Sequence, residues 1–322
     1  MRWTLAVVAG VLLLLQPVYL LFLQPCEDVA CRATGRTAAR CQHADHEHDP
    51  AAAVSLEDRA IKRLLIRQGV SLIERGRTAD ASQFAKQLQL TSCELDLPRG
   101  APSLSDPAEL FRVAKESVVI VGGLYKCQHC TLWHVNIASG FVISAQGAIV
   151  TNYHVVDAAS EQTMVVMTAD SQVYPVQRVL AASRADDLAI LQVDARGLQP
   201  LALAASAAPA PVASAVSVIS HPDGRFFCYT AGVISRYMKI PAGGRSVDAV
   251  AITAEYARGS SGAPVLDSQG QVVAVVSATE SIYYTQDAAQ QRNLQMVFRT
   301  CVPVASLRNL LRPVGQIAGW AP

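Results

Sequence analysis

The chain has 322 residues, of which 51% are hydrophobic, 16% are charged and 6% are aromatic. Its 27 Lys and Arg residues against 26 Asp and Glu residues give a formal net charge of +1. This composition excludes a disordered or fibrous chain, and the length predicts one large domain or two modest ones. The near-neutral charge and the few aromatic residues argue against a nucleic-acid-binding surface, so no nucleic-acid partner is expected.

The N-terminal segment contains an uncharged apolar run over residues 3–23, preceded by Arg2. A helix of about 20 apolar residues spans the hydrocarbon core of a bilayer. Residues 1–25 are therefore predicted to be a signal anchor or a signal peptide, and whether the segment is cleaved stays open. Lipidation at Cys26 is a third alternative. In each case we expect the bulk of the chain to be extracytoplasmic, periplasmic or extracellular. An uncleaved anchor, the favoured alternative, would also attach the chain to a membrane.

Residues 26–104 are expected to form a tether followed by a helical region of unknown role. The tether ends in three histidines interleaved with acidic residues, which is typical of a solvated linker and, less often, of a weak metal site (His43, His46 and His48). Apolar spacing predicts a helix over 55–75, and a second helix over 80–90 has Asp80 as its N-cap. Asp106, Pro107 and Glu109 form a capping pattern that begins a third helix.

After Ser117 the pattern changes to short runs rich in Val and Ile. These predict strands at 118–122, 138–144, 148–152, 163–168, 188–193, 215–220, 249–253, 271–277 and 294–299. Most of the runs are too close together for the helical crossovers of a parallel sheet, so antiparallel barrels are favoured. The Ala- and Pro-rich stretch 201–215 is a candidate connection between two halves, and a last helix is predicted over 303–312 before a tail at 313–322.

All eight cysteines lie beyond the apolar run, and an even number in an oxidising compartment is compatible with disulfides. Cys228 and Cys301 are one candidate pair, although the spacing alone does not fix the connectivity. Cys127 and Cys130 lie in a predicted hairpin turn with His134 nearby, and a local disulfide is the favoured interpretation. The alternatives are zinc bound by these three residues, redox chemistry, and free or differently paired thiols. No cofactor is expected.

Three segments together contain the residues that predict a chemical activity. They are Thr151-Asn152-Tyr153-His154-Val155, Asp187-Leu188-Ala189-Ile190-Leu191 and Gly259-Ser260-Ser261-Gly262-Ala263-Pro264, with Ala138-Ser139-Gly140-Phe141 ahead of them. In this order they resemble the trypsin-like (chymotrypsin-fold) serine proteases, most closely the bacterial HtrA/DegP-like branch. The resemblance covers about residues 105–312 and implies a mainly β fold of two antiparallel six-stranded β-barrels.

The resemblance also implies an exported, membrane-tethered serine endopeptidase with a protein or peptide substrate. A serine hydroxyl needs a neighbouring base, so His154 is expected to act as general base and acid, with Asp187 orienting it. Ser261 is the expected nucleophile of an acyl-enzyme mechanism. The backbone N–H groups of Gly259 and Ser261 are the expected oxyanion hole. The oligomeric state stays open.

This sequence departs from the family pattern at two positions, because Ser260 replaces Asn or Asp and Ala263 replaces Gly. A looser loop and an oxyanion hole that is not preformed are therefore possible outcomes. Glu255, six residues before Ser261, is a candidate for the base of a specificity pocket, with an exposed surface glutamate as the alternative. With a predicted tail of only ten residues after residue 312, the PDZ domain of HtrA-like proteases is not expected. A catalytically degenerate peptide-binding relative and a metal-binding envelope protein are the alternative functions.

Overall fold

The computed structural model describes residues 55–98, 100, 106–127, 130–157, 162–204, 209–286 and 291–312. The expected anchor or signal at 1–25, the expected tether up to residue 54 and the tail at 313–322 lie outside the described residues. Within the described ranges, no helix combines the length and the apolar character needed to cross a bilayer.

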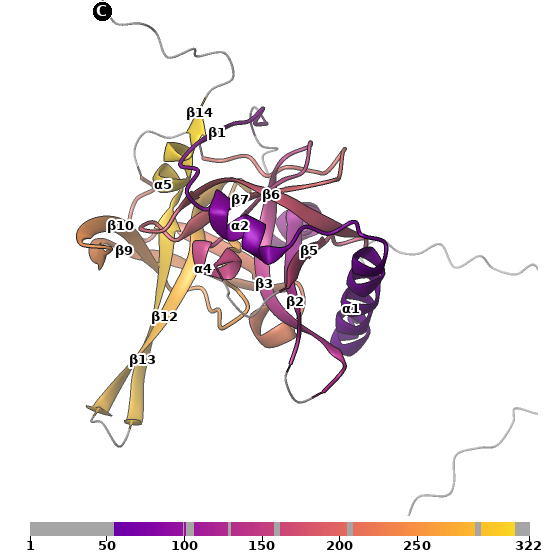
Figure 1. Cartoon of the computed structure of the whole chain (residues 1–322). Coiled ribbons are helices and arrows are strands. Elements are labelled where there is room, and N and C mark those ends of the chain that lie inside the picture. Colours follow the sequence, from indigo (N-terminus) through magenta and orange to yellow (C-terminus); the bar gives the residue numbers. More distant parts are fainter. Residues whose placement is uncertain are drawn as a thin grey trace, which may run out of the picture. The chain divides into compact units, whose positions relative to one another are not determined.

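Two six-stranded rings form the body of the described chain (Figure 1). The first closes in the order β2-β3-β4-β7-β6-β5, with the bounds β2 Val118–Lys126, β3 Trp133–Ser144, β4 Ala148–Thr151, β5 Thr163–Met167, β6 Val173–Ser183 and β7 Leu188–Val193. The second closes in the order β10-β13-β12-β11-β8-β9, with the bounds β8 Ala215–Ser220, β9 Cys228–Ala242, β10 Arg245–Ile252, β11 Pro264–Leu266, β12 Val272–Gln286 and β13 Gln291–Pro303.

Neighbouring strands within both rings are antiparallel. The predicted mainly β class with two antiparallel six-stranded barrels is therefore confirmed. One small parallel pair lies outside the rings, between β1 (Cys93–Glu94) and β14 (Leu311–Arg312). It joins the end of the predicted helical region to the end of the described chain.

Few helices accompany the barrels, and two of the predicted caps are in place. Helix α2 (Ala81–Gln87) begins after Asp80, whose carboxylate accepts from Ser82 N–H at 2.7 Å. Helix α3 (Pro107–Ala114) begins after Asp106, whose carboxylate accepts from Ala108 N–H at 3.2 Å. In both cases a side chain satisfies a backbone donor that the first turn leaves unpaired. The other helical segments are α1 Asp58–Glu74, η1 Lys115–Ser117, α4 Tyr153–Val156, η2 Pro222–Gly224 and α5 Val304–Asn309.

Helix α1 packs on the first barrel. Leu65 on this helix is fully buried and shares a cluster with Ile120 and Leu124 of β2. Gly69 lets the helix approach closely, since a Cβ atom there would lie 2.5 Å from the Leu124 side chain. At the start of the helix, the Asp58 carboxylate accepts from Phe226 N–H at 3.0 Å. The region predicted as helical and of unknown role is thus attached to the protease-like body.

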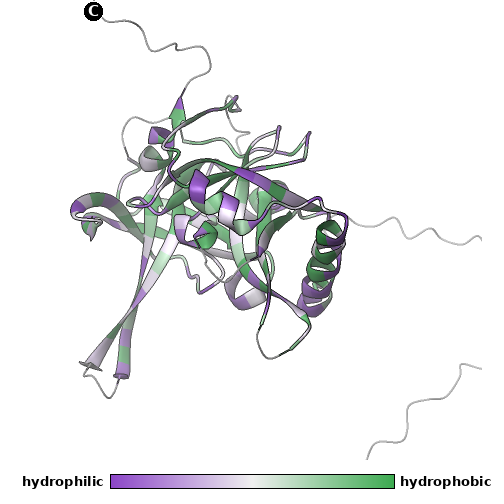
Figure 2. Ribbon diagram, in the orientation of Figure 1, coloured by the Kyte–Doolittle hydropathy of each residue, from purple (hydrophilic) through white to green (hydrophobic). Residues whose placement is uncertain are grey.

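The largest core cluster joins the two barrels to each other. It contains Phe141 and Ile190 of the first barrel and Ile219, Leu266 and Val275 of the second, all fully buried. Figure 2 shows hydrophobic colouring along the barrel strands and more hydrophilic colouring at the outer parts of the chain. Burial of this apolar surface fixes the barrels against each other, so the loops at their junction have defined positions.

Three strands of the two barrels were not predicted, β6, β9 and β11, and neither was the small outer pair of β1 and β14. Strands β6 and β9 mix buried and exposed positions without a continuous apolar run, and each contains a proline. Strand β11 has only three residues and directly follows the Gly-rich loop. Strands β12 and β13 extend beyond the predicted runs as a long hairpin (Figure 1), and the predicted helix at 303–312 is only the six residues of α5.

Candidate active site

The first barrel presents His154 on a single helical turn, α4, directly after strand β4. All four residues of β4 are buried, so the chain leaves the barrel at a fixed point. Asn152, the N-cap position of α4, is fully buried, and its Nδ2 donates to the backbone carbonyl of Asp187 at 2.8 Å. This bond links the turn that carries His154 to the turn that carries Asp187.

Asp187 lies just before β7 with a positive φ of 53°. Its carboxylate oxygen Oδ1 accepts from the backbone N–H of His154 at 3.1 Å and lies 3.0 Å from Nδ1 of the same residue. The other oxygen, Oδ2, accepts from the Ser277 hydroxyl at 2.7 Å. Because an ionised carboxylate only accepts, the proton of neutral His154 is assigned to Nδ1, and Nε2 is left as an acceptor.

The second barrel presents Ser261 on the loop between β10 and β11. The glycines on either side of Ser260 and Ser261 have positive φ, 95° at Gly259 and 85° at Gly262. A Cβ atom at Gly262 would lie 2.3 Å from Ser139 O and 2.5 Å from Thr151 Oγ1. Only glycine combines this backbone conformation with such a close approach. Strand β3 also holds the loop through a backbone hydrogen bond, in which Ser139 N–H donates to Ser261 O at 2.9 Å.

Ser139 is the junction between the two barrels. Its hydroxyl donates to Gly259 O at 2.9 Å and accepts from His221 N–H at 3.1 Å. Its carbonyl accepts from the Thr151 hydroxyl at 2.9 Å. Ser139 is fully buried, so these bonds are shielded from water. One side chain of the first barrel thus fixes two loops of the second.

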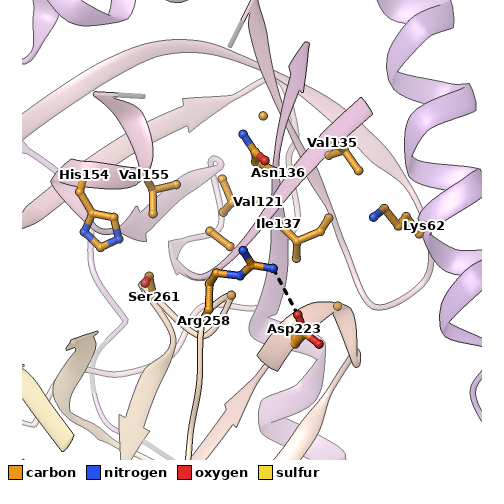
Figure 3. A pocket seen from close by; sticks show the side chains of 14 residues that line it. Lys62, Val121, Val135, Asn136, Ile137, His154, Val155, Asp223, Arg258 and Ser261 are labelled. Carbon is orange, nitrogen blue, oxygen red and sulfur yellow. Dashed lines mark hydrogen bonds and ion pairs between the residues drawn. The ribbon is translucent and has the colours of Figure 1, made fainter. Parts of the chain in front are cut away.

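A cavity of about 350 Å³ opens beside these residues. His154, Ser261 and Gly259 line it together with residues 135–138 of β3 and with Lys62, Asp223 and Arg258. Figure 3 shows His154 and Ser261 near each other at one end and Lys62 of α1 at the other, with the ion pair of Arg258 and Asp223 between them. The structure therefore brings the two expected reacting side chains to one cavity.

The two departures from the family pattern fit the loop. Ser260 is fully buried, its hydroxyl accepts from Ser220 Oγ at 2.9 Å, and its backbone N–H donates to Ala257 O at 2.9 Å. Ala263 is also fully buried, packs in the core of the second barrel and has its backbone N–H and carbonyl paired. Neither replacement leaves a gap or an unpaired group at that position, so the expected loosening has no basis in these contacts.

Glu255 lies away from this cavity. Its carboxylate pairs with Arg299 at 3.0 Å, and its side chain is 79% exposed. Glu255 is not among the residues that line the cavity. The acid is thus already neutralised by a cation, which agrees better with the surface-glutamate alternative.

The described cysteines form no disulfide. The Sγ atoms of Cys127 and Cys130 lie 3.1 Å apart, too far for the bond of about 2.05 Å that was favoured. Cys130 Sγ also lies 3.0 Å from His134 Nε2. The candidate pair of Cys228 and Cys301 is not joined: Cys228 Sγ lies against Arg225 O, and Cys301 is buried beside the Tyr256 hydroxyl. Burial raises the pKa of Cys301 to about 12, so this thiol stays protonated and inert.

Sequence reasoning missed three residues that position the site: Ser277, Ser139 as a hydrogen-bonding group, and His221. His221 is fully buried, and its Nδ1 accepts from Phe227 N–H at 3.1 Å. Burial lowers the pKa of His221 to about 3, so its ring is neutral. Ser277 ends the run 271–277 predicted as a strand, and no local pattern marks its hydroxyl as a partner of Asp187.

Known proteins are similar to part of this chain. Residues 138–275 match the trypsin-like peptidase domain family. "Protease Do-like 1, chloroplastic" of Arabidopsis thaliana is 36% identical over 149 residues, which are 44% of this chain and 33% of that protein. "Probable periplasmic serine endoprotease DegP-like" of Hahella chejuensis is 31% identical over 184 residues, 56% of this chain and 37% of that protein. The chain thus spans little more than a third of the length of these two relatives.

Among solved structures, the active form of the Rv3671c protease from M. tuberculosis is similar, with a TM-score of 0.50 and 26% sequence identity. The match covers 73% of this chain and 96% of that one. This match covers a larger share of the chain than the family match over residues 138–275 does. That agrees with the observation that the two barrels pack against each other through a shared core.

Proposed function

We propose that the chain is a serine endopeptidase of the HtrA/DegP-like kind that hydrolyses peptide bonds through His154, Asp187 and Ser261. The match of residues 138–275 to the trypsin-like peptidase domain family and the similarity to the proteases above support this proposal. The observation that carries the proposal is the set of hydrogen bonds on the Asp187 carboxylate. The Asp187 carboxylate is hydrogen-bonded to His154 and to Ser277, and His154 and Ser261 line the same cavity. A surface aspartate beside a histidine would not need three separate donors on its oxygens.

In the proposed reaction the Ser261 hydroxyl attacks the carbonyl carbon of the scissile bond. Nε2 of His154 removes the hydroxyl proton as the C–O bond forms, and the imidazolium that results keeps its Nδ1–H on Asp187. The carboxylate stays ionised and stabilises the positive ring. His154 then donates its Nε2 proton to the leaving amine, the C–N bond breaks, and an acyl-enzyme on Ser261 remains. Water, deprotonated by His154, hydrolyses the ester and restores the hydroxyl.

The tetrahedral intermediate carries a negative oxygen, which the backbone N–H groups of Gly259 and Ser261 would receive. The carbonyl of Arg258 accepts from Asp223 N–H at 2.6 Å. Since the C=O and N–H of a trans peptide point in opposite directions, the N–H of Gly259 points away from Asp223. This bond supports an oxyanion hole that is preformed rather than assembled by the substrate. Each such donor is worth roughly 3–4 kcal/mol of transition-state stabilisation.

We also propose that the protease acts outside the cytoplasm and is held at a membrane by its apolar run at residues 3–23. The length of the run supports this, and one of the relatives is named as periplasmic. Extracytoplasmic location with or without the anchor is tested by fractionating cells and sequencing the N-terminus of the mature chain. A mature N-terminus located after residue 23 would refute the membrane tether but would not contradict export. Recovery in the cytoplasm would refute both.

The experiment that tests the activity is labelling of the purified chain with a fluorophosphonate, which esterifies only an activated serine. We expect one label per chain, on Ser261, and none on Ser261→Ala. A matched control is Ser260→Ala, which removes the neighbouring hydroxyl but not the proposed nucleophile. Hydrolysis of an unfolded protein such as casein is measured in parallel.

The same data separate the alternatives. A degenerate peptide-binding relative would bind peptides without taking the label, whereas labelling with hydrolysis excludes that alternative. A metal-binding envelope protein without peptidase activity would neither take the label nor hydrolyse casein. Labelling of the Ser261→Ala variant at an unchanged level would overturn the assignment of the nucleophile.

A further inference from the structure

The hairpin formed by β2 and β3 carries a cluster of three metal-ligating side chains that the peptidase chemistry does not use. The ligand atoms of Cys127, Cys130 and His134 all lie within 4.8 Å of one another. Cys127 directly follows β2, Cys130 lies in the turn and His134 lies on β3, in a Cys-x₂-Cys-x₃-His pattern. We propose that this cluster is a zinc-binding site that fixes the end of the hairpin.

The chemistry of the donors favours zinc over harder cations. Thiolate sulfur and imidazole nitrogen bind Zn²⁺ in a tetrahedral arrangement, in which bonds of about 2.0–2.3 Å place neighbouring ligand atoms roughly 3.5 Å apart. The observed separations are 3.1 Å between the two sulfurs and 3.0 Å between Cys130 Sγ and His134 Nε2. The third separation, between Cys127 and His134, is at most 4.8 Å, so side-chain adjustments of about 1 Å would centre an ion among the three ligands.

Cross-strand contacts in the β2–β3 hairpin restrict the side chain of His134. Tyr125 and His134 are direct cross-strand partners, and their rings stack with centroids 5.4 Å apart. The next pair along the ladder is Lys126 and Trp133, with the Lys126 ammonium 4.9 Å from the centre of the indole ring. Cross-strand contacts of this kind restrict rotamers. His134 therefore presents Nε2 to Cys130 at little further entropic cost.

Three protein ligands leave the fourth tetrahedral position for water or for one more side chain. Binding would release the protons of both thiols, since thiolates are the ligating form. The site would thereby prevent the two neighbouring thiols from being oxidised in an extracytoplasmic compartment.

The position of the cluster predicts that metal binding affects the cavity. Strand β3 runs directly from His134 through residues 135–138, which line the cavity, to Ser139, which holds the loop of Ser261. An ion at the hairpin end would anchor the outer end of this wall. We therefore expect metal removal to raise KM for peptide substrates several-fold with a smaller effect on kcat.

The test uses the full chain, purified under reducing conditions and dialysed against Zn²⁺. Metal analysis is expected to give one zinc per chain, and Co²⁺ in its place is expected to give thiolate-to-metal charge-transfer absorption in the near ultraviolet. Cys130→Ser is expected to weaken Zn²⁺ binding at least ~10-fold against a chromophoric chelator. Cys93→Ser, which removes a half-buried cysteine of β1, is the matched control and is expected to retain the metal.

His134→Gln tests the nitrogen ligand and is expected to weaken Zn²⁺ binding by a similar factor. Circular dichroism on every variant separates loss of metal from loss of fold. Absence of zinc from the folded wild-type chain in excess Zn²⁺ would overturn the proposal, as would an unchanged affinity in both Cys130→Ser and His134→Gln. These readouts do not depend on peptidase activity, so the zinc site and the proposed function can fail separately.

Discussion

The two barrels contribute to the proposed catalytic site in different ways and hold their residues by different forces. In the first barrel, polar side chains position His154 and Asp187: Asn152 holds one turn, and Ser277 reaches across from the second barrel. In the second barrel, Ser261 is positioned by backbone bonds and by two glycines with positive φ. Substitutions in the first group should therefore reduce activity in a folded protein, while substitutions in the second should reduce stability.

The largest expected effect tests the first half of this comparison. Asp187→Asn keeps the shape of the side chain but replaces an acceptor by a donor, so His154 would favour the wrong tautomer. We expect kcat to fall on the order of 10⁴-fold with an unchanged unfolding midpoint. Peptide hydrolysis and urea unfolding measure the two quantities.

Asp186→Asn is the matched control for that substitution. The Asp186 carboxylate accepts from Ser183 Oγ at 2.6 Å and pairs with Arg245 at 3.2 Å, so it belongs to a separate group of contacts. We expect activity within about two-fold of wild type, because neither contact of Asp186 involves His154, Asp187 or Ser261 and an ion pair with an exposed Arg245 contributes little. A loss comparable with that of Asp187→Asn would show that the neighbouring acid had been misassigned.

The second half of the comparison predicts a stability effect at Gly262. An alanine Cβ there would lie 2.3 Å from Ser139 O, in a backbone conformation that L-residues avoid. We expect Gly262→Ala to lower the free energy of unfolding by more than about 3 kcal/mol. Gly197→Ala has a similar φ of 72° with no atom within 4 Å, and the cost there should be about 1–2 kcal/mol. Equal losses in the two variants would mean that φ alone, and not the close approach, sets the requirement for glycine.

Ser139 connects the two halves, so its removal should affect both properties. Ser139→Ala leaves the buried His221 N–H without its acceptor and Gly259 O without its donor. We expect a loss of about 1–3 kcal/mol in unfolding free energy, together with reduced kcat because the Gly259 loop loses a contact. Ser235→Ala removes one hydrogen bond of 3.1 Å between strands far from the loop and should cost about 1 kcal/mol with no change in kcat. If Ser139→Ala behaved like this control, the inter-barrel junction would not depend on the hydroxyl.

His221 adds a dependence on pH to the second barrel. Its pKa is lowered from 6.5 to about 3 by burial, so between these values the unfolded chain binds a proton that the folded chain does not. Stability is therefore fully present above pH 6.5 and falls as the pH drops, by up to about 1.4 kcal/mol per pH unit. His221→Asn keeps an acceptor for Phe227 N–H and should remove this part of the slope. Urea unfolding of both proteins at pH 7, 6 and 5 measures it, and parallel slopes would contradict the prediction.

The sequence predicts the reacting residues better than it predicts their supports. His154, Asp187 and Ser261 stand in local motifs, so their order and neighbours identify them. Ser277 and Ser139 act through contacts that are 90 and 120 residues apart in the chain, which no local pattern encodes. The same limit explains β9, whose partly exposed residues form a strand only because β8 and β10 pair with it on either side.

The smallest expected effect concerns Glu255, where the structure favours the less specific of two interpretations. Its carboxylate is exposed and pairs with Arg299, so it offers no unpaired charge to a basic substrate side chain. We expect Glu255→Gln to change the ratio of kcat/KM for peptides with Lys and with Leu before the scissile bond by less than about two-fold, as for other exposed pairs. Glu280→Gln, on the exposed part of β12, is the control for a general change of charge. A selective loss of cleavage after Lys in Glu255→Gln alone would instead place this acid in the specificity pocket, with Arg299 as the cation that the substrate displaces.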